Sequence, residues 1–154
     1  MLCFRPCPVD EEPAATLVQR MRDEIAALYE GLDLDGAQMP KGGAAELCPP
    51  HGTFLVGFED DVALCCGGLK RLSQDACEIK RMFVVDCARG RGVARELLCE
   101  LERRARELGY SVARLDTGPR QPHAQRMYER AGYVAIGNFN ANPVASFFGE
   151  KRLV

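Results

Sequence analysis

Apolar residues recur at two different periods along the chain, and each change of period predicts the border of an element. Over residues 13–30 they repeat every three or four positions, which predicts an amphipathic helix of about five turns. The same spacing returns over residues 93–108 and 121–133, and Gly109 and Gly132 suit the ends of these two helices. The periodicity therefore predicts three helices.

Runs with the length and composition of β-strands lie before, between and after these helices. They span residues 2–8, 53–58, 62–72, 76–85, 111–118, 133–136 and 146–153. Only the letters EDD separate the second run from the third, which predicts an antiparallel hairpin. Residues 31–52 carry five glycines and three prolines with little periodicity, and a loop of that length is usually functional or mobile.

The predicted order of elements is β-α-loop-β-β-β-α-β-α-β-β. A run of antiparallel strands that leads into a strand-helix-strand unit predicts an α/β or α+β protein with a mixed sheet. Neither an internal repeat nor a linker divides the chain of 154 residues, so we expect a single domain over residues 1–154.

Composition and charge narrow the classes of function. A hydrophobic share of 47% is normal for a globular protein, and a net charge of −2 argues against general binding to nucleic acid. The apolar runs are far shorter than the roughly 20 residues of a membrane helix, so we expect no membrane segment. Eight cysteines without a C-x-x-C pair, and only two histidines, predict reduced thiols in the cytoplasm and no metal site.

The letters DCARGRGVAREL, residues 86–97, join a predicted strand to a predicted helix. A turn at this place directs free backbone N–H groups toward one point, at the positive end of the helix dipole. Gly90 and Gly92 would let a ligand approach the main chain closely, as a pyrophosphate site requires. A tight turn with solvated arginines explains the same letters, and neither a Rossmann fingerprint nor a P-loop is present.

Arg89, Gly92 and Ala94 match (Q/R)-x-x-G-x-(G/A), the acyl-CoA pyrophosphate motif of the GNAT superfamily of N-acetyltransferases. The letters EIKRMFV, LDTGPRQP and AQRMYERAGY resemble a bacterial-type branch of that superfamily in the same order, roughly over residues 53–136. The resemblance implies the acyl-CoA N-acyltransferase fold, a mixed and mostly antiparallel sheet of about six to seven strands flanked by about four helices. It also implies an enzyme that moves the acetyl group of acetyl-CoA directly to a primary amine of a small molecule or peptide.

The resemblance assigns the binding of acetyl-CoA to a strand edge and to the glycine-rich turn. In the superfamily, the strand before the motif pairs its backbone with the pantetheine arm, and here that strand includes residues 82–85. The backbone of residues 89–95 would hold the pyrophosphate. The cofactor-binding residues implied in this way are Met82, Phe83, Val84, Val85, Arg89, Gly90, Arg91, Gly92, Val93, Ala94, Arg95, Gln121 and Tyr128.

Tyr128 follows Gln121 by seven positions and Ala124 by four, which matches the superfamily motif N-P-x-A-x-x-x-Y with Gln121 in place of the commoner Asn. The resemblance implies that the tyrosine hydroxyl is a catalytic acid that protonates the departing CoA thiolate. The alternative is a tyrosine of an amphipathic helix whose hydroxyl is simply solvated.

Glu78 precedes Arg89 by eleven positions, the offset of the catalytic general base in members that acetylate protein lysines. A base is useful because an amine must lose a proton when it attacks a thioester. One alternative is that Glu78 only forms an ion pair with Lys80 or Arg81 at a strand edge. A second candidate carboxylate, Asp116, lies on the following strand.

The resemblance weakens where the acceptor would bind. Residues 139–143 read FNANP, which is shorter than the insert of related sequences and lacks its tyrosine, and residues 31–52 do not align safely. The competing function is a CoA-binding sensor or partner-regulating module with little activity. Many members of the superfamily dimerise, so a homodimer is a candidate assembly, although no isolated hydrophobic stripe marks an interface. The candidates for an acidic acceptor pocket are Asp33, Asp35, Glu46 and Asp116.

Overall fold

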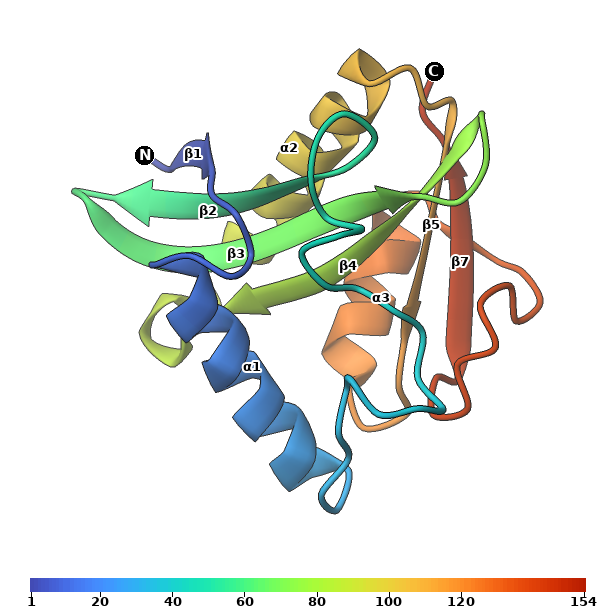
Figure 1. Cartoon of the computed structure of the whole chain (residues 1–154), viewed down its shortest axis with the longest axis horizontal. Helices are drawn as coiled ribbons and strands as arrows, with labels where there is room; N and C mark the ends of the chain where they lie inside the picture. The colour runs from blue at the N-terminus through green and yellow to red at the C-terminus, as the bar shows by residue number, and fades with distance from the viewer.

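A computed structural model describes residues 1–154 and places seven strands in one sheet (Figure 1). In chain order these are β1 (Cys3–Pro6), β2 (Thr53–Glu59), β3 (Val62–Arg71), β4 (Ala76–Val84), β5 (Val112–Thr117), β6 (Val134–Ala135) and β7 (Phe147–Arg152). The strand order in the sheet is β1-β2-β3-β4-β5-β7-β6, and only β4 and β5 run parallel. The sheet is therefore mixed and mostly antiparallel, as predicted.

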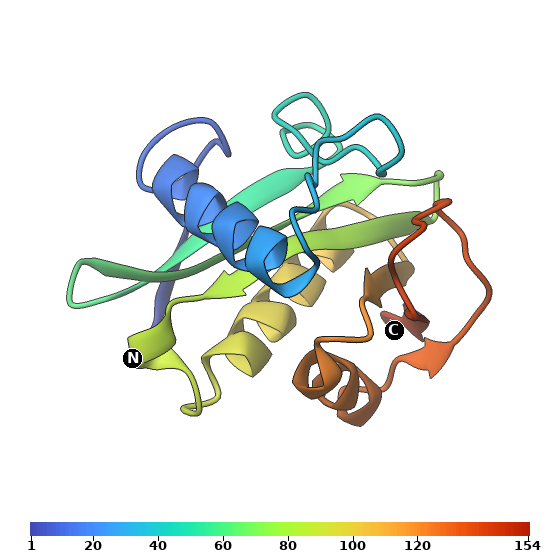
Figure 2. The ribbon, with the colours of Figure 1, turned by 90° about the horizontal axis from the view of Figure 1, so that it is seen from below.

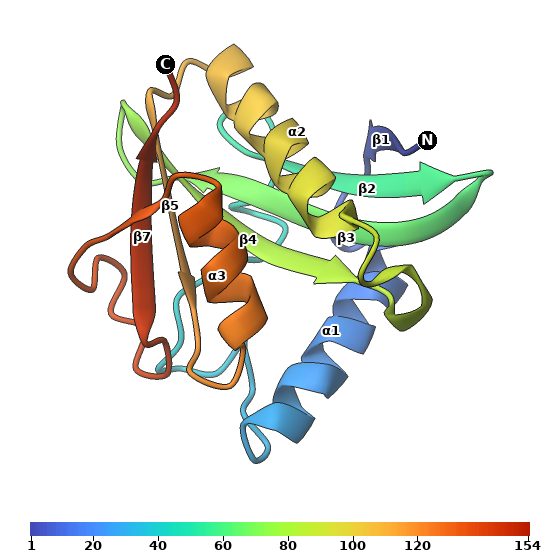
Figure 3. The same cartoon turned by 180° about the vertical axis from the view of Figure 1, so that it is seen from behind.

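Helices cover both faces of this sheet. They are α1 (Ala14–Leu28), the short 3₁₀ helix η1 (Asp86–Ala88), α2 (Val93–Glu107) and α3 (Pro122–Arg130). Figure 2 shows α1 on one face, and Figure 3 shows α2 and α3 on the other. The three helices predicted from periodicity are confirmed. The structure has these three α-helices and one 3₁₀ turn of three residues, where the resemblance implied about four helices. None of these helices has both the length and the apolar character that crossing a membrane requires.

The hairpin of β2 and β3 follows from its turn residues. Asp60 and Asp61 have φ angles of 51° and 63°, so both central residues lie in the left-handed region. A two-residue turn of this kind twists in the same sense as the strands that it joins, and Asp tolerates it better than most residues. The prediction from the letters EDD is thus confirmed, with Glu59 paired to Val62.

The apolar helix faces form the core with the sheet. A cluster of 31 buried residues includes Ala14, Leu17, Val18, Met21 and Ile25 of α1, and Val93, Leu97, Leu98, Leu101 and Ala105 of α2. Burial of each leucine side chain contributes roughly 2 kcal/mol of apolar transfer free energy. These residues are the ones that recur at helical spacing, which is why periodicity located the core correctly.

The strands β4 and β5 diverge along their length, and this divergence places the site. They pair only through Ala76, Cys77 and Glu78 against residues 112–114. Beyond this contact β4 carries a bulge, because Cys66 pairs with Phe83 and Gly68 with Lys80, which leaves two residues of β4 opposite Gly67 alone. Figure 1 shows the two strands side by side at one end and apart at the other. The edge of β4 that faces β5 is thereby open along residues 79–84.

The C-terminal end of α1 is fastened to the chain that follows β5. The hydroxyl of Tyr29 accepts a hydrogen bond from the backbone N–H of Arg120 at 3.1 Å and donates one to the side chain of Gln121 at 3.1 Å. Gly118 makes this contact feasible, since a Cβ atom there would lie 2.1 Å from the Tyr29 hydroxyl. The contact holds α1 across the space between β4 and β5.

Candidate functional site

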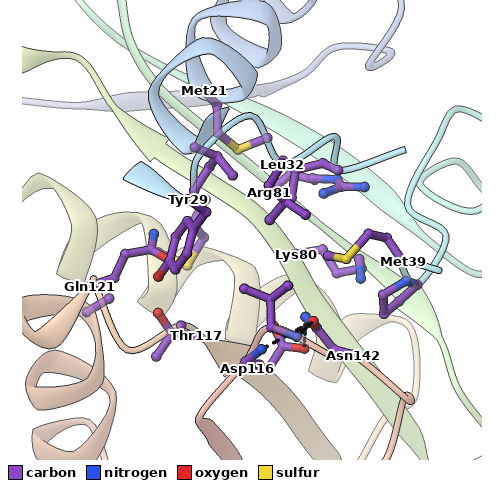
Figure 4. Close-up of a pocket in the computed structure, with 18 of the residues that line it drawn as sticks. Met21, Tyr29, Leu32, Met39, Lys80, Arg81, Asp116, Thr117, Gln121 and Asn142 are labelled. Atoms are coloured by element: carbon purple, nitrogen blue, oxygen red, sulfur yellow. Dashed lines mark hydrogen bonds between the residues drawn. The ribbon is translucent and has the colours of Figure 1, made fainter. Parts of the chain in front are cut away.

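A cavity of about 180 Å³ lies where β4 and β5 separate (Figure 4). Its walls come from α1, β4, β5, α3 and two loops, residues 29–40 and 142–145. The lining residues of interest here are Leu32, Leu34, Met39, Lys80, Arg81, Met82, Phe83, Asp116, Gln121, Tyr128, Asn142 and Val144. The cavity thus joins charged groups from two strands with an apolar wall.

The glycine-rich turn forms an open concave surface at the start of α2. Gly90 and Gly92 have φ angles of 78° and 77°, and no atom lies within 4 Å of a Cβ placed on either residue. Helix α2 begins at Val93, so the backbone N–H groups of its first turn have no partner within the helix. Free donors, unobstructed space and the positive end of a helix dipole together suit a phosphorylated ligand.

Two of the three arginines of this turn, Arg89 and Arg91, are occupied by the protein's own groups. Arg89 pairs with Glu24 at 2.8 Å and Asp86 at 2.9 Å, and its Nε donates to the Val84 carbonyl at 2.9 Å. Arg91 pairs with Glu59 at 3.2 Å. The unpaired donors of the turn are therefore its backbone N–H groups and the exposed side chain of Arg95, rather than these two guanidinium groups.

Tyr128 projects from α3 into the cavity and is 8% exposed. Its hydroxyl donates to the sulfur of Met82 at 3.8 Å, so α3 and β4 meet at this point. Burial raises the pKa of Tyr128 above its ordinary value of 10.0, and the charge of Asp116 acts in the same direction. The hydroxyl consequently keeps its proton through the neutral range and remains able to donate it.

Glu78 and Asp116 meet at a single side-chain amide. The Nδ2 atom of Asn140 donates to Glu78 Oε2 at 2.8 Å and to Asp116 Oδ2 at 2.7 Å, one hydrogen to each carboxylate. Asn142 adds a second donor to Asp116 Oδ2 at 3.0 Å. The amides separate two like charges that would otherwise repel each other.

The two carboxylates differ in their access to the cavity. Glu78 is 1% exposed and pairs with Lys80 at 3.3 Å and Lys70 at 4.0 Å. The cavity is lined by Asp116 and Lys80 but not by Glu78. Burial lowers the pKa of Lys80, while the charge of Glu78 opposes this shift. The alternative of an ion pair between Glu78 and Lys80 is therefore present in the structure.

The loop that supplies the amides repeats asparagine at every second position. The backbone N–H of Asn140 donates to the side chain of Asn138, that of Asn142 to Asn140, and that of Val144 to Asn142. Asparagine favours such local bonds, which shape the backbone of the loop. Sequence reasoning treated these residues only as a departure from related sequences, and the alternation of asparagines is the signal that it missed.

The other predicted site residues fall into two groups. Met82, Phe83, Gln121 and Tyr128 line the cavity, whereas Val84, Val85 and residues 89–95 continue from it along the open edge of β4 and the turn. Of the four acidic candidates for the acceptor pocket, only Asp116 lines the cavity. Asp35 instead pairs with Arg22 at 2.9 Å.

Comparisons with known proteins agree with this geometry. The Acetyltransferase (GNAT) family profile matches residues 16–133. A protein named IAA acetyltransferase from Azospirillum brasilense is 33% identical over 111 residues, which cover 70% of this chain and 72% of the relative. The crystal structure of a GNAT-family acetyltransferase from Staphylococcus aureus Mu50 matches with a TM-score of 0.80 at 16% identity, over 100% of both chains.

A second solved structure adds a ligand to the comparison. PaiA N-acetyltransferase from Thermoplasma acidophilum, in complex with coenzyme A, matches with a TM-score of 0.70 at 15% identity and covers 99% of each chain. These likenesses confirm the acyl-CoA N-acyltransferase fold that the sequence motifs implied.

We expect the exchange Asn140→Asp to lower the free energy of unfolding by about 3 kcal/mol, because it replaces the shared donor with a third carboxylate beside Glu78 and Asp116. The matched control is Asn138→Asp, at an exposed position of the same loop, where a change of about 0.5 kcal/mol is expected. Urea unfolding measures both. Equal losses in the two variants would contradict a bridge at Asn140.

Proposed function

The chain belongs to the GNAT acetyltransferase family and is an acetyl-CoA-dependent N-acetyltransferase, and from this premise we propose that it transfers the acetyl group directly to a primary amine of a small molecule or peptide. The supporting observation is that Tyr128 and Asp116 line one cavity at the open edge of β4. This places a group that holds a proton and a group that accepts one within the same space.

The fit of acetyl-CoA rests on two features of the backbone. Residues 82–85 form an edge that β5 leaves unpaired, and the amides of a pantetheine arm are suited to pair with such an edge. Residues 89–95 form the open turn, in which the N–H groups of residues 90–95 are free for a pyrophosphate and only that of Arg89 is bonded, to the Asp86 carbonyl at 3.2 Å. Acetyl-CoA supplies the acetyl group as an activated thioester, and the protein supplies orientation and proton transfer.

The two proton transfers are assigned to two different side chains of the cavity. As the bond from the amine nitrogen to the acetyl carbon forms and the carbon–sulfur bond breaks, the sulfur needs a proton and the nitrogen must lose one. We assign the first proton to the hydroxyl of Tyr128. Asp116 is the carboxylate in contact with the cavity, so we assign it the amine proton, and we assign Glu78 the positioning of Asp116 through Asn140.

Direct transfer is supported by the placement of the cysteines. None of them lines the cavity. Burial raises the pKa of Cys77 to about 12, so this thiol near Glu78 has almost no nucleophilic thiolate at neutral pH. An acetylated cysteine intermediate therefore has no suitable candidate in the site.

The proposed function is tested by incubating the protein with acetyl-CoA and a panel of primary amines and peptides, with detection of the acetylated products by mass spectrometry. Acetylation of at least one amine at a rate well above the uncatalysed reaction is expected. Stabilisation by CoA without turnover on any amine would contradict the proposal. Detection of products is preferable to a thiol dye, because four exposed free cysteines, Cys3, Cys48, Cys87 and Cys99, can react with the dye.

We expect Gly92→Val to lose nearly all of its affinity for CoA. A side chain at a φ of 77° strains the turn and also fills the space that the pyrophosphate would occupy. Arg91→Ala should weaken binding only modestly, since Arg91 is engaged with Glu59. Gly109→Val is the matched control: its φ is 94°, at the far end of α2. If calorimetry shows that Arg91→Ala binds CoA more weakly than Gly92→Val does, the proposal that backbone N–H groups bind the pyrophosphate is contradicted.

We expect Tyr128→Phe to lower kcat by about tenfold or more with little change in CoA affinity, because the variant keeps the ring and loses the acid. Tyr110→Phe serves as control, since the Tyr110 hydroxyl bonds to the His51 carbonyl outside the cavity. In the wild type, the raised pKa of Tyr128 predicts no loss of activity from its ionisation below pH 10. Unchanged kcat in Tyr128→Phe would exclude the acid function.

We expect Asp116→Asn to lower kcat about 100-fold, because the amide of the variant cannot accept the amine proton. Glu78→Gln should lower kcat less, since it changes only the neighbour of the base and keeps the side chain's shape. A larger loss of kcat in Glu78→Gln than in Asp116→Asn would assign the base to Glu78.

A further inference from the structure

Arg81 occupies an unusual position in the cavity. It lies in the bulge of β4 with a φ of 60°, and its side chain is only 8% exposed while it lines the cavity. Its Nη2 atom is buried and has no hydrogen-bond partner in the protein. Its remaining contacts are weak: Nε lies 3.4 Å from the Gly42 carbonyl, and Nη2 lies 3.6 Å from Asp35.

The charge of Arg81 is poorly compensated by the surrounding chain. Asp35, the only carboxylate within 4.0 Å of it, is half exposed and is held more closely by Arg22 at 2.9 Å, and the charges of Glu78 and Asp116 act on Arg81 from farther away. Burial lowers the pKa of Arg81, with Asp35 acting in the opposite direction, but a guanidinium stays charged at neutral pH. A buried cation with free donors is costly unless an anion binds it.

The other charged groups of the cavity are already committed. Glu24 pairs with Arg89 at 2.8 Å, and Lys80 pairs with Glu78 at 3.3 Å. Asp116 differs from these, because its bonds are to the amides of Asn140 and Asn142 and no Lys or Arg nitrogen lies within 4.0 Å of it. The cavity therefore contains one cation without a close anionic partner, Arg81, and one carboxylate without a close cationic partner, Asp116.

An apolar surface lies beside these two groups. Leu32, Leu34, Met39 and Val144 line the same cavity, from the loop after α1 and the loop before β7. In Figure 4, Arg81 and Leu32 lie toward α1, whereas Asp116 lies near Asn142 at the other side of Lys80. A ligand that satisfies all three features carries an anion, an amine and an apolar group.

Building on the proposed acetyl transfer, we propose that the acceptor is a free amino acid with an apolar side chain, whose carboxylate is bound by Arg81 and whose amino group lies at Asp116. The guanidinium fork of Arg81 suits a carboxylate, which accepts two hydrogen bonds in one plane. The amino group is acetylated as described above, and the carboxylate is bound without chemical change. A peptide N-terminus lacks this free carboxylate.

The first test compares three amines of matched shape with the wild-type protein: L-leucine, L-leucinamide and 3-methylbutylamine. We expect L-leucine to have a KM at least about tenfold lower than either of the others, the usual contribution of a charge-assisted hydrogen bond. Equal or lower KM for the amide or the plain amine overturns the proposal, while acetyl transfer itself remains supported.

A binding measurement separates the acceptor class from the transfer reaction. Saturation-transfer NMR with the CoA-saturated protein reports binding of the same three amines without turnover. Preferential binding of L-leucine supports the carboxylate site even when no amine is acetylated, an outcome that would contradict only the transferase function. Absence of any preference for L-leucine overturns the inference.

The variant Arg81→Met removes the guanidinium group and replaces the side chain with an unbranched apolar one. We expect the ratio of the two KM values, 3-methylbutylamine over L-leucine, to fall at least about tenfold in this variant. Arg71→Met is the control, since Arg71 is an exposed residue of β3 that contacts His51 and does not line the cavity. An unchanged ratio of KM values in folded Arg81→Met overturns the proposal. If this variant does not fold, the comparison of the three amines with the wild-type protein decides whether the proposal stands.

Discussion

The brief pairing of β4 with β5 is the constraint on which the rest of the site depends. Three residues of β4 engage β5, and then the bulge at Arg81 turns the strand away from its neighbour. A bulge bends its strand and redirects side chains, so one local irregularity both opens a backbone edge and creates a cavity. The fastening of Tyr29 to residues 120–121 closes that space on the side of α1.

Charge in the site is organised by amides rather than by opposite charges alone. Asn140 allows Glu78 and Asp116 to approach the same point, because one amide group satisfies a lone pair on each carboxylate. The lysines compensate the deeper carboxylate, Glu78, and leave Asp116 free of a cation. Because of this difference, we assign the two carboxylates different roles in the proposed reaction: Asp116 accepts the amine proton and Glu78 positions Asp116.

The arginines illustrate how the same side chain serves different ends. In the glycine-rich turn, Arg89 and Arg91 are paired with carboxylates of the chain, so the turn presents backbone donors to a ligand. In the bulge, Arg81 is buried without an adequate partner and presents its side chain instead. Arg89 and Arg91, which the motif makes conspicuous, are thus less available to a ligand, and the inconspicuous Arg81 is the arginine with a buried donor that has no partner.

The sequence alone determined the order of the elements, the hairpin at Asp60 and Asp61, the core faces of the helices and the glycine-rich turn. Each of these follows from local period or from the φ angles that a residue type accepts. The motif around Tyr128 also indicated the family. Only the tertiary structure decided that Asn140 joins Glu78 and Asp116, which lie 62 and 24 positions away, and that Arg81 lacks a partner. Such contacts form between residues that are far apart in the sequence and are brought together by the diverging strands. A local sequence pattern contains no information about which distant residues will meet.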